Sequence, residues 1–101
     1  MRLFGASDSG CTACVCIIEE KNKKYRINIA NIGDCRAIIA CKDGSALRIT
    51  NDHKATEKSE IDRIKANKGV IINQRVNGTL AITRAFGDFD LKNKVFHFTL
   101  F

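Results

Sequence analysis

Three cysteines near the start of the chain are of the residue type that can bind a metal ion. Cys11, Cys14 and Cys16 fall within one short segment. A structural zinc site usually combines four ligands, and its first pair commonly spans a tight turn. Cys14 and Cys16 lie in an apolar, β-branched run instead, and no later CxxC or HxxxH pair completes the set. Zinc binding is one interpretation, and small apolar thiols buried in a strand are the one that we favour.

A second group of candidates consists of acidic residues and a histidine. Asp52, His53 and Lys54 are consecutive, and histidine is the usual proton shuttle in acid–base catalysis. Asp34 follows a glycine at a break between two apolar runs, and aspartate oxygens suit hard cations such as Mg²⁺. Asp43 also precedes a glycine, a pair typical of a hairpin turn. We expect His53 to be a loop and helix-entry residue and Asp43 to be a turn residue.

The size and composition indicate one soluble domain. The chain has 101 residues, which fits a single domain. Its 5 cysteines are an odd number without a secretory signal, which favours reduced thiols. No apolar run approaches the ~20 residues of a membrane span. We therefore expect a cytoplasmic or nuclear protein that is neither secreted nor associated with a membrane.

The formal net charge of +6 raises the question of an acidic partner. A basic surface can attract nucleic acid, membranes or phosphorylated proteins. The lysines are spread over turns and a helix, and no aromatic–basic platform of the kind that stacks on bases is visible. The charge thus indicates a solvated basic surface, and we expect no nucleic-acid partner.

The first half of the sequence predicts antiparallel strands. Residues 12–19 are apolar and β-branched, which predicts a strand buried on both faces or nearly so. Residues 25–32 alternate apolar with polar, which predicts a half-buried strand. Residues 36–41 and 46–50 follow as two shorter strands joined by a turn. Short turns between all of these strands favour an antiparallel meander.

The second half predicts one helix and a hairpin. The helix is expected at 57–68, with Thr56 as its N-cap, the acidic Glu57 and Glu60 in its first turn and Gly69 as its C′ residue. A strand is predicted from 70 to 76 and its partner from 80 to 82. The Asn-Gly pair between them is a strong signal for a two-residue hairpin. We expect Arg75, Arg84 and Asp88 to join polar networks that fix this hairpin to neighbouring loops. These patterns together predict an α+β arrangement.

Four segments carry motifs that resemble the middle of one enzyme family. They are residues 9–13 (SGCTA), 31–37 (NIGDCRA), 50–54 (TNDHK) and 75–88 (RVNGTLAITRAFGD). Between the last two, residues 60–69 resemble a family helix that ends in glycine. The order and spacing are similar to those of the PPM family, the metal-dependent protein phosphatases of the 2C type. The resemblance covers nearly the whole chain.

The resemblance implies a fold, an activity and a cofactor. The family fold is a sandwich of two antiparallel sheets flanked by helices. We therefore expect a partial sandwich of antiparallel strands with one main helix: a single partial domain over 1–101 with a divergent tail at 93–101. Family members hydrolyse phosphoserine and phosphothreonine with two Mg²⁺ or Mn²⁺ ions, which activate a water and clamp the phosphoryl group.

Asp34 is the metal-site position that the resemblance carries over to this chain. It matches a family aspartate that helps to bind a third, weaker metal ion. The family's other metal-binding aspartates and its phosphate-contacting arginine belong to motifs that this sequence lacks. Mg²⁺ usually needs more than one carboxylate or a substrate phosphate. The other role open to Asp34 is to cap a turn between two strands. We expect no catalytic residue in this chain and no stably bound Mg²⁺ or Mn²⁺.

Two functional hypotheses follow from this pattern. The first is a chain of the phosphatase family that is inactive by itself. The second is a non-catalytic regulatory or binding module on the phosphatase scaffold, a decoy or dimerising fragment that engages phosphoproteins through its basic surface.

Self-association is a further expectation. Half of a sandwich exposes apolar sheet surface and unpaired strand edges. A symmetric second copy would cover both. We therefore predict a homodimer, formed by packing or by segment exchange, with the Phe-rich tail at 93–101 as a candidate for the interface.

Overall fold

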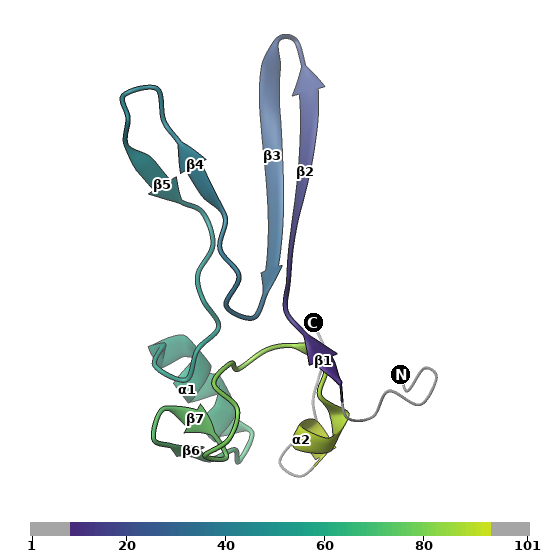
Figure 1. Cartoon of the computed structure of the whole chain (residues 1–101), viewed down its shortest axis with the longest axis vertical. Helices are drawn as coiled ribbons and strands as arrows, with labels where there is room; N and C mark the ends of the chain where they lie inside the picture. Colours follow the sequence, from purple (N-terminus) through teal and green to yellow (C-terminus); the bar gives the residue numbers. More distant parts are fainter. Residues whose placement is uncertain (1–8, 94–101) are drawn as a thin grey trace.

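Two β-hairpins rise from a smaller body in the computed structural model of the chain, which describes residues 9–93 (Figure 1). The body contains one main helix, a short helix and two pairs of short strands. The strands pair antiparallel in four two-stranded sheets. This is the α+β architecture of antiparallel strands with one main helix that the sequence predicts. No helix within the described residues is long and apolar enough to cross a membrane.

The longer hairpin consists of β2 (Ala13–Lys21) and β3 (Lys24–Ile32). The two strands pair along their full length, from Ala13 opposite Ile32 to Lys21 opposite Lys24. Both residues of its turn have positive φ, 53° at Asn22 and 59° at Lys23. Two consecutive positive φ angles are the pattern of the turns that match the twist of a hairpin. The predicted strands 12–19 and 25–32 are therefore present, each with slightly different ends.

The burial predicted for these two strands is wrong. Val15, Ile17 and Ile18 are 54%, 58% and 63% exposed, and Tyr25 on β3 is 68% exposed. Cys14 and Cys16 are also exposed, as is Cys11, so these thiols are not the buried residues that we expected. The reason is that no further layer of the described residues packs on either face of this two-stranded ribbon. The apolar pattern is typical of a covered strand, but the cover is not supplied within this part of the chain.

The second hairpin consists of β4 (Ile38–Ala40) and β5 (Ala46–Arg48). Its turn follows the prediction: the N–H of Cys41 donates to the carbonyl of Ser45, and Gly44 takes a φ of 84°. The predicted meander is wrong, because β3 and β4 belong to separate sheets. The bend that follows β3 directs the chain away from that strand, and β4 pairs only with β5 among the described strands.

Helix α1 (Lys58–Ala66) lies below the hairpins, and both of its ends differ from the prediction. Glu57, not Thr56, is the N-cap residue, and it makes no side-chain capping bond. At the other end, Lys68 adopts the left-handed φ of 61° that we assigned to Gly69. The N–H of Gly69 donates to the carbonyl of Ile64, at 2.8 Å. This bond is the long-range one of a Schellman motif, so Gly69 is the C″ residue.

The segment after the helix folds into two tight reversals, not into the strand predicted for 70–76. β6 (Ile71–Ile72) turns back into β7 (Arg75–Val76) through Asn73 and Gln74, with φ angles of 50° and 59°. The Asn-Gly pair then forms the predicted turn. The strand predicted at 80–82, after this turn, does not form. Residues 80–82 contribute only single bridges, one of them between Val76 and Leu80.

A last pair of short strands joins the start of the described chain to its end, where a short helix follows. β1 (Gly10–Cys11) pairs with β8 (Phe86–Gly87), and α2 (Phe89–Asn93) follows. The sequence patterns did not predict β1, β8 or α2. Gly87 has a φ of 71°, and a Cβ there would overlap the carbonyl oxygen of Ser9. Only glycine therefore allows the two backbones to approach this closely.

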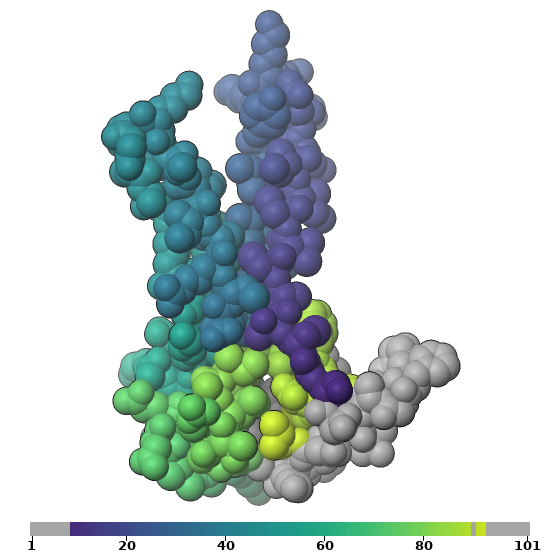
Figure 2. Space-filling model, in the orientation of Figure 1, coloured from purple at the N-terminus to yellow at the C-terminus, as the bar shows by residue number. Residues whose placement is uncertain are grey.

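The hydrophobic core of the described residues is small and lies in the lower body. Ala55, Ile64 and Val76 are buried together, and Ile71 and Leu80 pack against them. Figure 2 shows the two hairpins standing above this body and separated at their tips. The tail predicted as an interface lies mostly outside the described residues, at 94–101.

Candidate functional site

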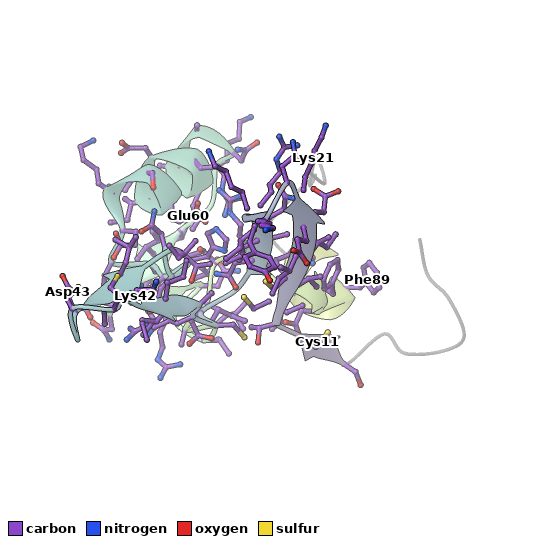
Figure 3. All side chains as sticks on the ribbon, turned by 90° about the horizontal axis from the view of Figure 1, so that it is seen from above. Cys11, Lys21, Lys42, Asp43, Glu60 and Phe89 are labelled. Atoms are coloured by element: carbon purple, nitrogen blue, oxygen red, sulfur yellow. The ribbon has the colours of Figure 1, made fainter. Side chains whose placement is uncertain are left out.

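Two buried carboxylates organise the polar residues at the base of the hairpins. Asp52 and Glu60 are 6% and 3% exposed, and each accepts hydrogen bonds from more than one cationic side chain. Figure 3 shows Glu60 on the side of α1 that faces the rest of the molecule, far from Asp43 at the outer end of the β4–β5 hairpin. Both carboxylates are therefore held in place by several cationic partners.

Asp52 connects the residues around the second hairpin. It accepts hydrogen bonds from Nε and Nη2 of Arg36, at 2.9 and 2.7 Å, and from Nη2 of Arg48, at 2.6 Å. The ammonium of Lys54 lies 3.4 Å away. The hydrogen bonds from Arg36 and the nearby ammonium hold the pKa of Asp52 well below its usual value, despite the opposing effect of burial. Asp52 is thus a fixed anion that joins three backbone segments.

Glu60 connects helix α1 to a loop that follows much later in the chain. Its carboxylate accepts from Nη2 of Arg84 at 2.5 Å, from Nη2 of Arg63 at 2.7 Å and from the hydroxyl of Thr83 at 2.6 Å. Burial alone would raise the pKa of Glu60, but these three donors lower it to about 2. The network satisfies the buried carboxylate and fixes Thr83 and Arg84 in place.

His53 has a structural role in this arrangement, as predicted. The ring atom Nδ1 of His53 accepts a hydrogen bond from the backbone N–H of Gly33, at 3.1 Å. The backbone N–H of His53 donates to the carbonyl of Gly33. The carbonyl of His53 in turn accepts from the N–H of Thr83. Burial lowers the pKa of His53, and the charge of Arg84 adds to that effect. The ring is therefore a neutral acceptor that joins two loops.

Asp34 lies in the bend that follows β3. Its side chain is 41% exposed, and the ammonium of Lys54 lies 3.9 Å from one of its oxygens. The described residues contain no group of three or more His, Cys, Asp or Glu side chains that could hold a metal ion. One half-exposed carboxylate beside an ammonium does not match what Mg²⁺ or Mn²⁺ requires. The described residues therefore do not fit a resident metal ion.

The other candidates from the sequence are dispersed. Asp43 accepts from the N–H and the hydroxyl of Ser45, which lowers its pKa and makes it a turn residue, as predicted. Cys14 and Cys16 lie on one face of β2, because residues two apart on a strand share a face. Cys11 belongs to β1. The chain has free thiols at all five cysteines.

Some residues of the two networks were missed from the sequence. Arg36 and Arg48 carried no separate expectation, and Glu60 was noted only as an acidic residue in the first helical turn. Arg84 was expected to join a polar network with the Asn-Gly turn, but its partner is Glu60 on the helix. A useful signal was available: a carboxylate at an otherwise apolar helix position must find cations if it is buried.

The antiparallel hairpins and the single main helix define the class as an α+β scaffold. The sequence model of protein phosphatase 2C matches residues 2–99, so the chain belongs to that family. The family is metal-dependent in general.

Curated relatives support this assignment. Protein phosphatase 2C homolog 1 of Schizosaccharomyces pombe is 44% identical over 88 residues, which are 85% of this chain and 25% of that protein. Protein phosphatase ppm-1.G of Caenorhabditis elegans is 45% identical over 85 residues, 84% of this chain and 16% of that protein. Probable protein phosphatase 2C 21 of Arabidopsis thaliana is 40% identical over 93 residues, 92% of this chain and 25% of that protein. The chain thus spans a quarter or less of these relatives.

Proposed function

We propose that this chain is a structural segment of a metal-dependent phosphoprotein phosphatase and that it does not hydrolyse phosphate esters by itself. The observation that carries the proposal is the isolation of Asp34. It is the one family metal position that the sequence carries over, and no cluster of potential metal ligands surrounds it within the described residues. A hydrolytic site of this family needs several carboxylates to hold Mg²⁺ or Mn²⁺ and activate a water.

The two buried networks support a scaffold role. The Asp52 network holds Arg36, two residues after Asp34, and the bonds of His53 hold the backbone of Gly33, one residue before it. The bend is therefore fixed from both sides without any ligand. We infer that this segment presents Asp34 in a defined position to a metal centre whose other carboxylates belong to family motifs that this sequence lacks.

The test is a phosphatase assay with a defined substrate. The chain is incubated with Mn²⁺ and a phosphothreonine peptide, and released phosphate is measured against a protein-free control. We expect no release above that control. Phosphate release that disappears in Asp34→Asn, but persists in the matched surface variant Glu57→Gln, would overturn the proposed inactivity.

A second candidate function is a non-catalytic binding module, which the exposed apolar strands favour. The formal net charge of +6 suits a phosphorylated partner. Binding of a phosphopeptide that weakens with salt, and is not matched by the unphosphorylated peptide or by duplex DNA, would support this function. Equal binding of duplex DNA would instead indicate a non-specific basic surface.

A further inference from the structure

Two arginines meet on one buried carboxylate at the base of the second hairpin. Arg36 donates to Asp52 through Nε and Nη2, at 2.9 and 2.7 Å, and Arg48 donates through Nη2, at 2.6 Å. Nε of Arg36 and Nη2 of Arg48 share the same oxygen, Oδ1. The two guanidiniums therefore lie side by side. We call Arg36 and Arg48 the arginine pair.

The arginine pair is held in place by the chain itself. Besides its bond to Asp52, Arg48 donates through Nε to the carbonyl of Thr50, at 2.8 Å. The segment that carries Arg36 is tied to the same threonine, because the N–H of Ala37 donates to the hydroxyl of Thr50, at 2.9 Å. Each guanidinium is thus bound through two of its nitrogens. A side chain that is already immobilised loses little further entropy when it binds a ligand.

Positive charge exceeds negative charge around the arginine pair. Lys54 adds a third cation, 3.4 Å from Asp52 and 3.9 Å from Asp34. Within the described residues, these two carboxylates are the anions that form ion pairs with the three cations, so one positive charge is left uncompensated. The side chains of Arg36 and Arg48 are 52% and 46% exposed, whereas Asp52 is 6% exposed. The charge that reaches the solvent is therefore positive.

The remaining donors of the arginine pair indicate which anion it suits. Nη1 of Arg36 and Nη1 of Arg48 take no part in the bonds described above. A phosphate monoester carries a charge of about −1.5 to −2 at pH 7 and has three acceptor oxygens, so it can accept from two guanidiniums at once. A carboxylate has a single charge and two oxygens, which one guanidinium satisfies. The arginine pair therefore matches phosphate better than carboxylate.

We propose that the arginine pair is a non-catalytic site that binds the phosphate of a phosphorylated peptide. The assignment rests on the second candidate function, the binding of a phosphorylated partner, and gives that function a location in the fold. Guanidinium N–H groups hold the phosphate, and no bond is made or broken. The site therefore does not depend on a metal ion or on any hydrolytic activity of the chain.

The test measures the affinity of the whole chain for a labelled phosphothreonine peptide by fluorescence anisotropy, without divalent metal ions. Arg48→Gln keeps the bonds from Arg36 to Asp52, so the buried carboxylate remains paired, and urea denaturation checks that the variant folds. We expect its Kd to rise about tenfold, the loss of a hydrogen bond to a charged group. Arg48→Lys retains the charge but not the planar fork, so it should recover only part of the affinity.

The matched control is Lys42→Gln. Lys42 lies in the turn between β4 and β5, at the end of the hairpin opposite to Arg48. This variant removes the same charge from the same hairpin, and its Kd should rise less than about twofold, because salt screens distant exposed charges. Equal weakening by Lys42→Gln and Arg48→Gln would overturn the site, and so would a Kd that Arg48→Gln leaves unchanged. In both cases the binding function itself would stand.

Three further ligands decide what the arginine pair recognises. The unphosphorylated peptide and a peptide with glutamate in place of phosphothreonine should bind at least about tenfold more weakly than the phosphopeptide, and inorganic phosphate should displace the phosphopeptide. Equal binding of the glutamate peptide would overturn phosphate as the ligand. Binding of inorganic phosphate without binding of the phosphopeptide would overturn the peptide as its source. A wild-type chain that binds none of them at about 1 mM would overturn both the site and the binding function.

Discussion

The guanidinium of Arg84 donates to both carboxylate oxygens of Glu60, 24 residues earlier in the chain. Helix α1 is thereby fixed to the loop that leads to β8 and α2. Glu60 is 3% exposed, so its charge is removed from water and depends on its partners. This pair is the longest-range side-chain link among the hydrogen bonds described above, and it has measurable consequences.

Removing the charge of Glu60 should destabilise the fold. In Glu60→Gln, Arg84 and Arg63 lose a shared anion while still partly buried. We expect the free energy of unfolding to fall by about 2–3 kcal/mol, below the full cost of breaking a buried pair, because Arg84 is partly exposed. Urea denaturation measures the change. The control is Asp62→Asn, since Asp62 pairs with Lys58 in water and should cost less than about 0.5 kcal/mol.

The same carboxylate should make stability depend on acidic pH. The folded-state pKa of Glu60 is about 2, below its value in the unfolded chain, which is about 4.3. The unfolded chain therefore binds the proton first as the pH falls. The stabilisation is fully present above the unfolded pKa and is lost as the pH falls from about 4.5 towards 2. The urea midpoint measured across this window should decline less steeply in Glu60→Gln.

His53 should be neutral in the folded chain near pH 7. Its Nδ1 accepts from the backbone of Gly33, so the ring proton belongs on Nε2. Its pKa is lowered by burial, so its contribution to stability is present above the unfolded pKa, about 6.5, and is lost as the pH falls below it. Nitrogen chemical shifts from a pH titration report both tautomer and pKa. A protonated Nδ1 at pH 7 would contradict the geometry.

Lys68 offers a stabilising substitution. Its φ of 61° at the C′ position of α1 is a conformation that glycine adopts more readily. We expect Lys68→Gly to raise the free energy of unfolding by about 0.5–1 kcal/mol. Lys65→Gly, three residues earlier and inside the helix, should have the opposite sign and cost about 1 kcal/mol. Equal effects at the two positions would refute the assignment of the helix end.

Local elements were largely predictable, and their ends were not. Hairpin turns at Asp43 and Asn77 follow from short-range backbone chemistry, and so does the existence of the helix. The helix end was misplaced by one residue, because Lys68 takes the left-handed conformation beside an available glycine. The strand predicted for 70–76 breaks at Asn73 and Gln74, where a turn without glycine gives little sequence signal.

Burial was the weaker part of the prediction. The alternation in β3 and the apolar run in β2 describe strands that are covered, yet Ile18 and Tyr25 face solvent in the described chain. A hydrophobic pattern records which face seeks cover, and it does not say which molecule or segment provides it.

The sequence alone determined the family and the α+β class, because these depend on local motifs and their spacing, and Asp34 as a metal position stays a prediction from the same motifs. Only the tertiary structure decided where the cations lie. It placed Lys54 beside Asp34 and Arg84 on Glu60, and it left the β2–β3 faces open. Such pairings depend on the distance in space between residues far apart along the chain, which no local pattern encodes.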